Sequence, residues 1–159
     1  MHLLLTVNDG INQNAREPIH VLETGNAREF IVQYSPGFIQ GIAAGDVIEV
    51  EYGSVNFNVV KRSGNICIQL FRRNSIDVVM SCLDDEFKKI EGRLDGKIDC
   101  ACVYTVNLQN YGFEKIESVL SDIMQKELVH EWIYGNVYEI DGITPLNWWQ
   151  PENPNYYKK

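Results

Sequence analysis

The first sixty-four residues alternate between short apolar runs and turn-forming residues. The runs are rich in β-branched or aromatic side chains and are bounded by Gly, Asn, Pro or Ser, which is typical of strands. Segment 46–52 alternates polar and apolar side chains, as expected for a strand with one solvent-exposed face. The pattern predicts a small, strongly bent sheet or partial barrel over residues 1–64, with strands at 3–7, 19–23, 29–34, 47–52 and 56–62.

A helical period first appears after residue 64. A nearly continuous apolar run at 66–71 favours a central strand. Apolar residues then recur at offsets 0, 3, 4, 7, 11 and 14 from Ile76, which predicts a helix with one apolar stripe. Asn74 or Ser75 is expected to cap the N-terminus of this helix through its side chain.

A second helical stripe follows, with apolar residues at offsets 0, 3, 4, 7, 8 and 12 from Ile116, and it predicts a helix over residues 113–131. Between the helices, residues 93–96 are expected to turn into a strand at 98–106. Residues 133–140 are expected to form the last strand. The order over 65–140 is therefore β-α-β-β-α-β, which predicts an α+β, ferredoxin-like unit with two helices on one face of a four-stranded antiparallel sheet.

Residues 141–159 differ from both halves because they contain three prolines and four aromatic residues. Prolines at this density exclude a helix or a central strand. Trp148 and Trp149 are expected to fold back and plug the edge of the sheet. The alternative is an exposed aromatic anchor for a partner, since Trp and Tyr are enriched at interface hot spots. The pattern leaves Tyr156 and Tyr157 open between these two roles.

The charge balance narrows the classes of partner. The chain has 14 basic and 22 acidic residues, a formal net charge of -8 and a sequence pI near 4.8. An acidic surface repels phosphate, which argues against direct binding to nucleic acid or to an anionic membrane. The short apolar start at 1–7 lacks the basic lead-in of a secretory signal and runs into a turn signal at 8–10. We therefore expect a cytoplasmic protein with reduced cysteines.

The sequence shows no metal-binding or catalytic motif. Cys100 and Cys102 form a C-x-C pair on an expected strand, where both thiols would share a face, and the three histidines are scattered along the chain. No nucleophile elbow or phosphate-binding glycine loop is present. His130 and Glu131 are the best acid–base candidates, although a cation near a helix C-terminus is common for dipole reasons alone. We expect no catalytic residues, no metal and no cofactor.

Acidic residues concentrate in the two-helix half. Residues 65–140 hold 8 basic and 13 acidic residues, against 4 and 7 in residues 1–64. A solvated helix face explains such a pattern in most proteins, but acidic faces also steer fast binding to basic proteins. The candidate partner-binding residues combine carboxylates with aromatic anchors: Glu49, Glu51, Asp84, Asp85, Glu86, Trp148, Trp149 and Tyr156.

Residues 37–50, GFIQGIAAGDVIEV, resemble the signature of a bacterial domain-of-unknown-function family whose members carry a PFFxxGIAxGDVVE segment, a strand pair and an RSGx turn. The turn corresponds to residues 62–65, RSGN, and the order of later elements is also similar, so the resemblance covers roughly residues 2–140. Residues 35–38 read SPGF where the family has two adjacent aromatics. The resemblance implies no established activity, but some members are similar to immunity proteins encoded beside toxin genes.

These observations lead to three function hypotheses. The first is a non-enzymatic immunity protein that neutralises a basic toxin domain, with a nuclease as the expected toxin. The second is a small-molecule-sensing regulatory domain, because ferredoxin-like units often hold effectors between sheets. The third is a small hydrolase or nuclease that uses His130 and nearby carboxylates. The residues do not distinguish a monomer from a homodimer.

Overall fold

The computed structural model describes residues 1–7, 15–154 and 156. It shows a mixed α+β chain with two open antiparallel sheets, and neither sheet closes into a barrel. The turn expected at 8–10 and Tyr157 lie outside the described residues. The first sheet has the strand order β1-β2-β3-β4-β5, with bounds β1 (His2–Thr6), β2 (Arg16–Glu23), β3 (Glu29–Val32), β4 (Val47–Glu49) and β5 (Asn58–Lys61).

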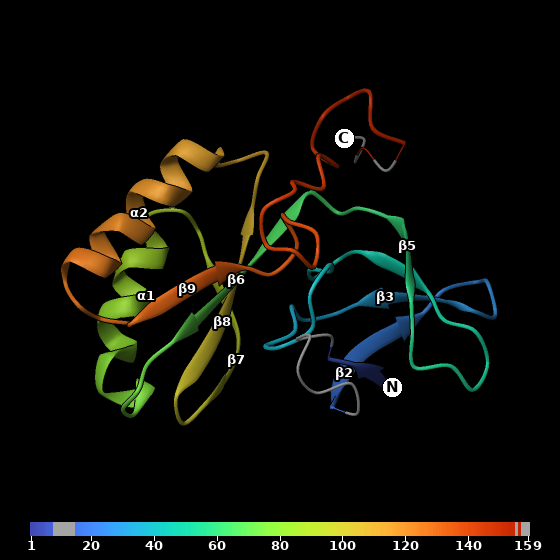
Figure 1. The fold of residues 1–159 in the computed structure, drawn as a ribbon, viewed down its shortest axis with the longest axis horizontal. Helices are drawn as coiled ribbons and strands as arrows, with labels where there is room; N and C mark the ends of the chain where they lie inside the picture. The colour runs from blue at the N-terminus through green and yellow to red at the C-terminus, as the bar shows by residue number, and fades with distance from the viewer. Residues whose placement is uncertain (8–14, 155, 157–159) are drawn as a thin grey trace.

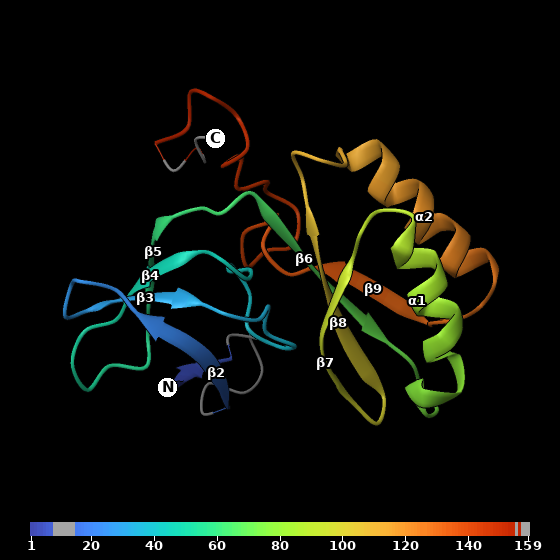
Figure 2. The same cartoon turned by 180° about the vertical axis from the view of Figure 1, so that it is seen from behind.

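The second sheet has the strand order β7-β8-β6-β9, and every neighbouring pair is antiparallel. The two helices lie on one face of this sheet, and the five-stranded sheet lies on the other side (Figures 1 and 2). Its elements are β6 (Asn65–Phe71), a 3-10 helix η1 (Ile76–Val79), α1 (Met80–Lys88), β7 (Arg93–Ile98), β8 (Ala101–Asn107), α2 (Phe113–Gln125) and β9 (Glu131–Tyr134).

Two main clusters of buried side chains form the core. The larger one fills the space between the helices and the four-stranded sheet, where the rings of Phe87 and Tyr104 stack at 3.8 Å between centroids. The smaller one covers the inner face of the five-stranded sheet and includes Ile39 and Ile42 from the loop after β3. A third small cluster of Ala43, Cys67 and Val103 packs this loop onto the second sheet. The loop therefore connects the two sheets.

The two segments that carry the family resemblance contact each other in the folded chain. Asp46 Oδ1 accepts hydrogen bonds from Ser63 N (2.8 Å) and Ser63 Oγ (2.9 Å), while Asp46 Oδ2 accepts from Ala43 N (3.0 Å) and Arg62 Nη1 (3.2 Å). Gly45 has a φ of +87°, and a Cβ there would lie 2.8 Å from Ser63 Cβ. Only glycine fits this conformation and this close approach without strain. These motif residues therefore have a structural role.

The start of the first helix differs from expectation. Residues 76–79 form a 3-10 turn, and the α-helix begins only at Met80. Ser75 lies at the N-cap position of the 3-10 turn, but its side chain makes no capping hydrogen bond. The predicted side-chain cap is therefore wrong, because Ile76 N instead donates to the carbonyl of Asp99 at 2.7 Å. A contact from a distant turn replaces the local cap.

The hairpin between the helices turns later than predicted. The turn occupies Asp99 and Cys100, and β7 runs through Asp95–Gly96 with an irregularity in register between Leu94 and Gly96. Asp95 is held inside the strand because its carboxylate accepts hydrogen bonds from Ser35 N at 2.7 Å and Thr105 Oγ1 at 2.6 Å. Cys100 consequently lies exposed in the turn while Cys102 is buried on β8. The expectation that both thiols share one strand face is wrong.

The last strand is shorter than predicted and ends at Tyr134. Beyond it, the side chain of Asn136 bridges to β6, since its Oδ1 accepts from Cys67 N (2.9 Å) and its Nδ2 donates to Asn65 O (2.8 Å). Trp148 then folds back into the larger core, 1% exposed, and its Nε1 donates to Asn136 O at 2.7 Å. Within the described residues, no helix is long and apolar enough to cross a membrane.

Candidate functional site

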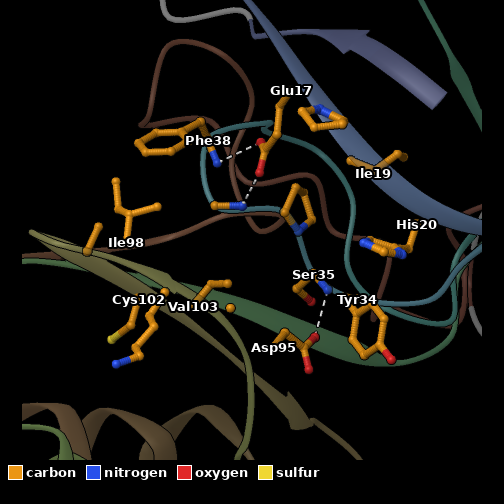
Figure 3. A pocket seen from close by; sticks show the side chains of 16 residues that line it. Glu17, Ile19, His20, Tyr34, Ser35, Phe38, Asp95, Ile98, Cys102 and Val103 are labelled. Atoms are coloured by element: carbon orange, nitrogen blue, oxygen red, sulfur yellow. Dashed lines mark hydrogen bonds between the residues drawn. The ribbon is translucent and has the colours of Figure 1, made fainter. Parts of the chain in front are cut away.

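The first candidate site is a cavity of about 300 Å³ that we call the inter-sheet cavity. Strand β2 and the segment after β3 form one wall, while β7 and β8 form the other (Figure 3). Its lining includes the apolar side chains of Ile19, Pro36, Phe38, Ile98 and Val103. The cavity therefore lies where the two sheets approach each other.

Glu17 fixes the upper wall of this cavity. Its Oε1 accepts a hydrogen bond from Gly37 N at 2.8 Å, and its Oε2 accepts from Phe38 N and Ile39 N, both at 3.0 Å. Figure 3 shows the carboxylate directed at this bend of the chain rather than into the cavity. The three amides satisfy the negative charge, so Glu17 holds residues 37–39 against β2.

Asp95 plays the corresponding role on the opposite wall. Besides its bonds to Ser35 and Thr105, it pairs with Arg93, whose Nε donates to Asp95 Oδ1 at 2.6 Å. The side chain of Asp95 has no exposed surface. The hydroxyls of Ser35 and Thr105 lie 2.6 Å apart, and Ala44 N donates to Ser35 Oγ at 2.9 Å. This network joins the loop after β3 to β7 and β8.

The polar groups of the cavity do not form a nucleophile–base pair among the described residues. Burial raises the pKa of Cys102 to about 12, so its thiol stays protonated and unreactive at neutral pH. The Ser35 hydroxyl is held by Thr105 and Ala44. His20 instead contacts His2, with the two Nε2 atoms 3.0 Å apart, and meets the Tyr34 ring edge-on at 5.5 Å. The apolar walls of the cavity can hold a small apolar molecule.

Two of the three histidines lie together in the fold. His2 and His20 are paired in the register of β1 and β2, so they are not scattered in space. Within residues 1–7, 15–154 and 156, no group of three or more His, Cys, Asp or Glu side chains could hold a metal ion. The candidate base His130 is exposed, and its Nδ1 accepts a hydrogen bond from Arg73 N at 3.0 Å.

The second candidate site is a groove of about 540 Å³ along β9, which we call the β9 groove. The Trp132 and Tyr134 rings meet nearly at right angles, with centroids 5.0 Å apart, and the Tyr138 ring is tilted against Tyr134 at 6.5 Å between centroids. Two exposed carboxylates, Glu117 and Glu139, also line it. The complete lining is Phe38, Gln40, Glu117, Trp132, Ile133, Tyr134, Tyr138, Glu139, Ile140 and Gly142.

A hydrogen bond fixes one of these carboxylates. Tyr134 OH donates to Glu117 Oε1 at 3.1 Å. Burial, followed by the negative charge of Glu117, raises the pKa of Tyr134, so the phenol stays protonated and keeps donating. Glu117 itself is exposed on α2 and lines the groove. The groove therefore combines negative charge with aromatic faces, which is the chemistry that attracts a cation.

The carboxylates expected to bind a partner do not form one surface. Glu49 is half-buried on β4, and Glu51 is exposed just after it, in the five-stranded sheet. The other predicted group lies on α1, on the far side of the four-stranded sheet (Figures 1 and 2). The predicted carboxylates therefore lie in two different parts of the molecule.

The three neighbouring carboxylates on α1 also diverge. Asp84 accepts a hydrogen bond from Tyr104 OH, and Asp85 is exposed beside Lys88. Glu86 is 3% exposed and pairs with Lys89 and Lys126. Glu86 is therefore a buried structural group rather than a partner-binding carboxylate, because both of its oxygens are engaged within the chain.

The aromatic candidates in the tail are likewise mostly enclosed. Trp148 is part of the core, so the exposed-anchor interpretation is wrong for it. Trp149 is half-buried and meets Phe113 edge-on at 5.1 Å. Tyr156 is half-buried, and its backbone N donates to Asn153 O at 2.9 Å. The tail packs against the body of the protein along this stretch.

No sequence motif indicated the β9 groove. Its residues come from three distant segments, 38–40, 117 and 132–142, and none of them carries a motif. The available signal was the alternation of Trp132 and Tyr134 with Ile133, which places two aromatic rings on one strand face. The sequence pattern does not show that Glu117 lies beside these rings, and only the fold brings them together in one groove.

The comparisons with known proteins bear on the fold and the family. The chain is similar to a crystal structure of a hypothetical protein from Neisseria gonorrhoeae, with a TM-score of 0.63 and 14% identity over 84% of this chain and 91% of the other. That likeness is one of fold. No curated protein matches the sequence. Residues 17–132 match the family described as a domain of unknown function (DUF4265). This match spans most of the chain, which therefore belongs to the DUF4265 family.

Proposed function

We propose that this protein is a non-enzymatic immunity protein that binds and neutralises a basic bacterial toxin domain, with a nuclease as the expected toxin. The observation that carries the proposal is the β9 groove, where two carboxylates flank aromatic side chains. The net charge of -8 supports it, because a negative surface attracts a basic protein. The proposal has the protein acting in the cytoplasm, before the toxin reaches its substrate.

The mechanism follows from the chemistry of a nuclease surface. A nuclease holds phosphate with Lys and Arg side chains, and such a cation is attracted to an aromatic face within about 6 Å of its centroid. Glu117 and Glu139 would pair with the same cations, while Trp132 and Tyr138 supply apolar contact. Exposed carboxylates elsewhere, such as Glu51 and Asp85, would contribute long-range attraction rather than direct contact.

The test begins with the neighbouring reading frames: if one encodes a toxin domain, binding to that domain is measured, followed by an assay of the toxin's activity. We expect a 1:1 complex that abolishes toxin activity. The association rate should fall as salt rises, since charges are screened beyond about 10 Å at 0.1 M ionic strength. The absence of any complex at micromolar concentrations would refute the proposed function. Turnover of a substrate by the isolated chain would refute its non-enzymatic part.

The inter-sheet cavity favours a second candidate function, a small-molecule-sensing regulatory domain. A cavity of about 300 Å³ with apolar walls lies at the lower end of the range that ligand sites occupy. A ligand that binds only the folded state raises the melting temperature. We expect a metabolite panel to give a shift of several degrees for a matching ligand, and a panel without any shift would count against this candidate.

The finer fold description is also a proposal. We propose that residues 65–140 form a ferredoxin-like unit, residues 1–64 a separate β-rich half, and residues 141–159 a tail. The strand order β7-β8-β6-β9 and the two helices on one face support this division. The core contribution of Trp148 argues that the tail belongs with the second unit.

A further inference from the structure

Strand β9 leaves one edge of the four-stranded sheet open. It is the terminal strand in the order β7-β8-β6-β9 and pairs with β6 along Glu131–Tyr134. The free edge of a terminal strand presents N–H and C=O groups that can pair with another strand. Among the described residues, no further strand pairs with this edge. The β9 groove lies against it.

The groove contains side chains from both faces of the sheet. Tyr134 reaches Glu117 on α2, so Trp132 and Tyr134 point to the helix face. Ile133 is in register with Gln69, whose side chain donates to Pro36 O at 3.0 Å on the opposite face. A cavity lined from both faces of an edge strand must pass around that edge. A molecule that fills the groove would therefore lie along the strand.

We propose that an extended, basic segment of a partner protein adds to β9 as a fifth strand of this sheet. The inference rests on the proposed function, because it specifies how the same groove would engage a basic partner. Main-chain hydrogen bonds would supply affinity, and side chains alternating between the two faces would supply specificity. The charge of the groove selects the partner, since its described lining includes Glu117 and Glu139 but no Lys or Arg.

The geometry limits the sequence that fits. Strand β9 has four residues, and a strand rises about 3.3 Å per residue, so a segment of four to five residues would pair along its length. Side chains of that segment would point alternately to the Trp132 and Tyr134 face and to the Phe38 and Ile133 face. The first face carries Glu117, so cationic side chains should occupy every second position of the segment.

Peptide probes test the pairing itself. The probe is an end-blocked heptapeptide of alternating Arg and Val, and its control replaces Arg with Glu. Two further versions carry N-methyl groups on one or the other set of alternate amides, because only one set can face β9. We expect the Arg probe to bind and the Glu peptide to bind at least tenfold more weakly. One of the two N-methylated versions should also have an affinity at least tenfold below that of the Arg probe. Equal binding of both N-methylated versions and the parent would overturn the proposal.

Hydrogen exchange of the full chain with the toxin domain separates this inference from the proposed function. We expect exchange of the outward-facing Trp132 and Tyr134 amides to slow at least tenfold in the complex, because the amides of Glu131 and Ile133 point to β6. A toxin complex that leaves the Trp132 and Tyr134 amides unchanged would overturn strand addition while the proposed function stands. Absence of a toxin complex would refute the proposed function. The peptide probes would still test strand addition at β9. Concentration-dependent protection of residues 131–134 without any probe would assign the edge to a second copy of this chain and overturn the proposal.

Discussion

Asp46 and Arg62 form a buried ion pair, with Arg62 Nη1 3.2 Å from Asp46 Oδ2 and exposures of 6% and 1% for Arg62 and Asp46. The same Arg62 nitrogen donates to Gly41 O at 2.6 Å, and the guanidinium lies 5.6 Å from the centre of the Trp148 ring. The pair therefore connects the loop after β3, the end of β5 and the C-terminal tail. This contact gives the two separated sequence motifs a common structural role.

Loss of this ion pair should destabilise the fold strongly. Arg62→Met leaves the buried carboxylate of Asp46 without its cation, and removal of one partner of a buried pair costs about 3–5 kcal/mol. Urea denaturation measures the change, with the exposed Asp85→Asn as the matched control, expected within about 0.5 kcal/mol of the parent. A loss below about 1 kcal/mol for Arg62→Met would contradict the structural role of the pair.

Gly45 should tolerate no side chain. In Gly45→Ala the new Cβ would lie 2.8 Å from Ser63 Cβ, at a residue whose φ is +87°. We therefore expect the free energy of unfolding to fall by about 1–3 kcal/mol. Gly25→Ala is the control, because a Cβ at residue 25 meets nothing within 4 Å. Thermal unfolding should show a lower melting temperature for the first variant only. Equal melting temperatures of the two variants would argue against the close contact.

Glu86 should make the stability depend on pH. Hydrogen bonds from Lys126 and Lys89 hold the pKa of Glu86 below its usual value of 4.5. The unfolded chain therefore binds the proton more readily, so the Glu86 contribution is present above about pH 4.5 and is lost as pH falls through the folded-state pKa. Glu86→Gln should destabilise the protein at pH 7 and have a smaller effect near pH 3. Urea denaturation over this range measures the difference, and a pH-independent effect would contradict the pairing.

Trp148 should behave as a core residue. Trp148→Ala removes a side chain that is 1% exposed and its hydrogen bond to Asn136 O. We therefore expect the free energy of unfolding to fall by about 3–5 kcal/mol. Trp149→Ala should cost less, because Trp149 is only half-buried. Chemical denaturation of both variants gives the comparison. If Trp149→Ala proved the more destabilising of the two, the tail would pack differently from the structure.

Local patterns predicted the parts of the fold that local forces determine. The apolar stripe from Ile76 corresponds to the buried face of η1 and α1, and the stripe from Ile116 to that of α2, because a helix must bury its apolar stripe against the sheet. The turn expected at residues 93–96 was wrong, because it was predicted from the local sequence alone. In the fold, Asp95 is held by Ser35, sixty residues away in the sequence. That contact cannot be read from the local sequence.

The site was less predictable than the fold for a related reason. Acidic composition indicated a basic partner, but it could not show which carboxylates remain available. Glu86 is sequestered by two lysines, whereas Glu117 and Glu139 reach a common groove from separate elements. Periodicity places a residue on a face of its own helix or strand. It does not show which faces of distant elements meet.

The direct test of the central claim is calorimetric titration of the adjacent toxin domain into the Glu117→Gln, Glu139→Gln double variant. Glutamine keeps an acceptor for Tyr134 OH while removing both charges, and Glu23→Gln, an exposed position on β2, is the control for general charge loss. We predict that the double variant binds the toxin domain at least tenfold more weakly than the parent. The affinity of Glu23→Gln should change by less than twofold. Equal affinities of the double variant and the parent would contradict the β9 groove as the site that captures a basic partner.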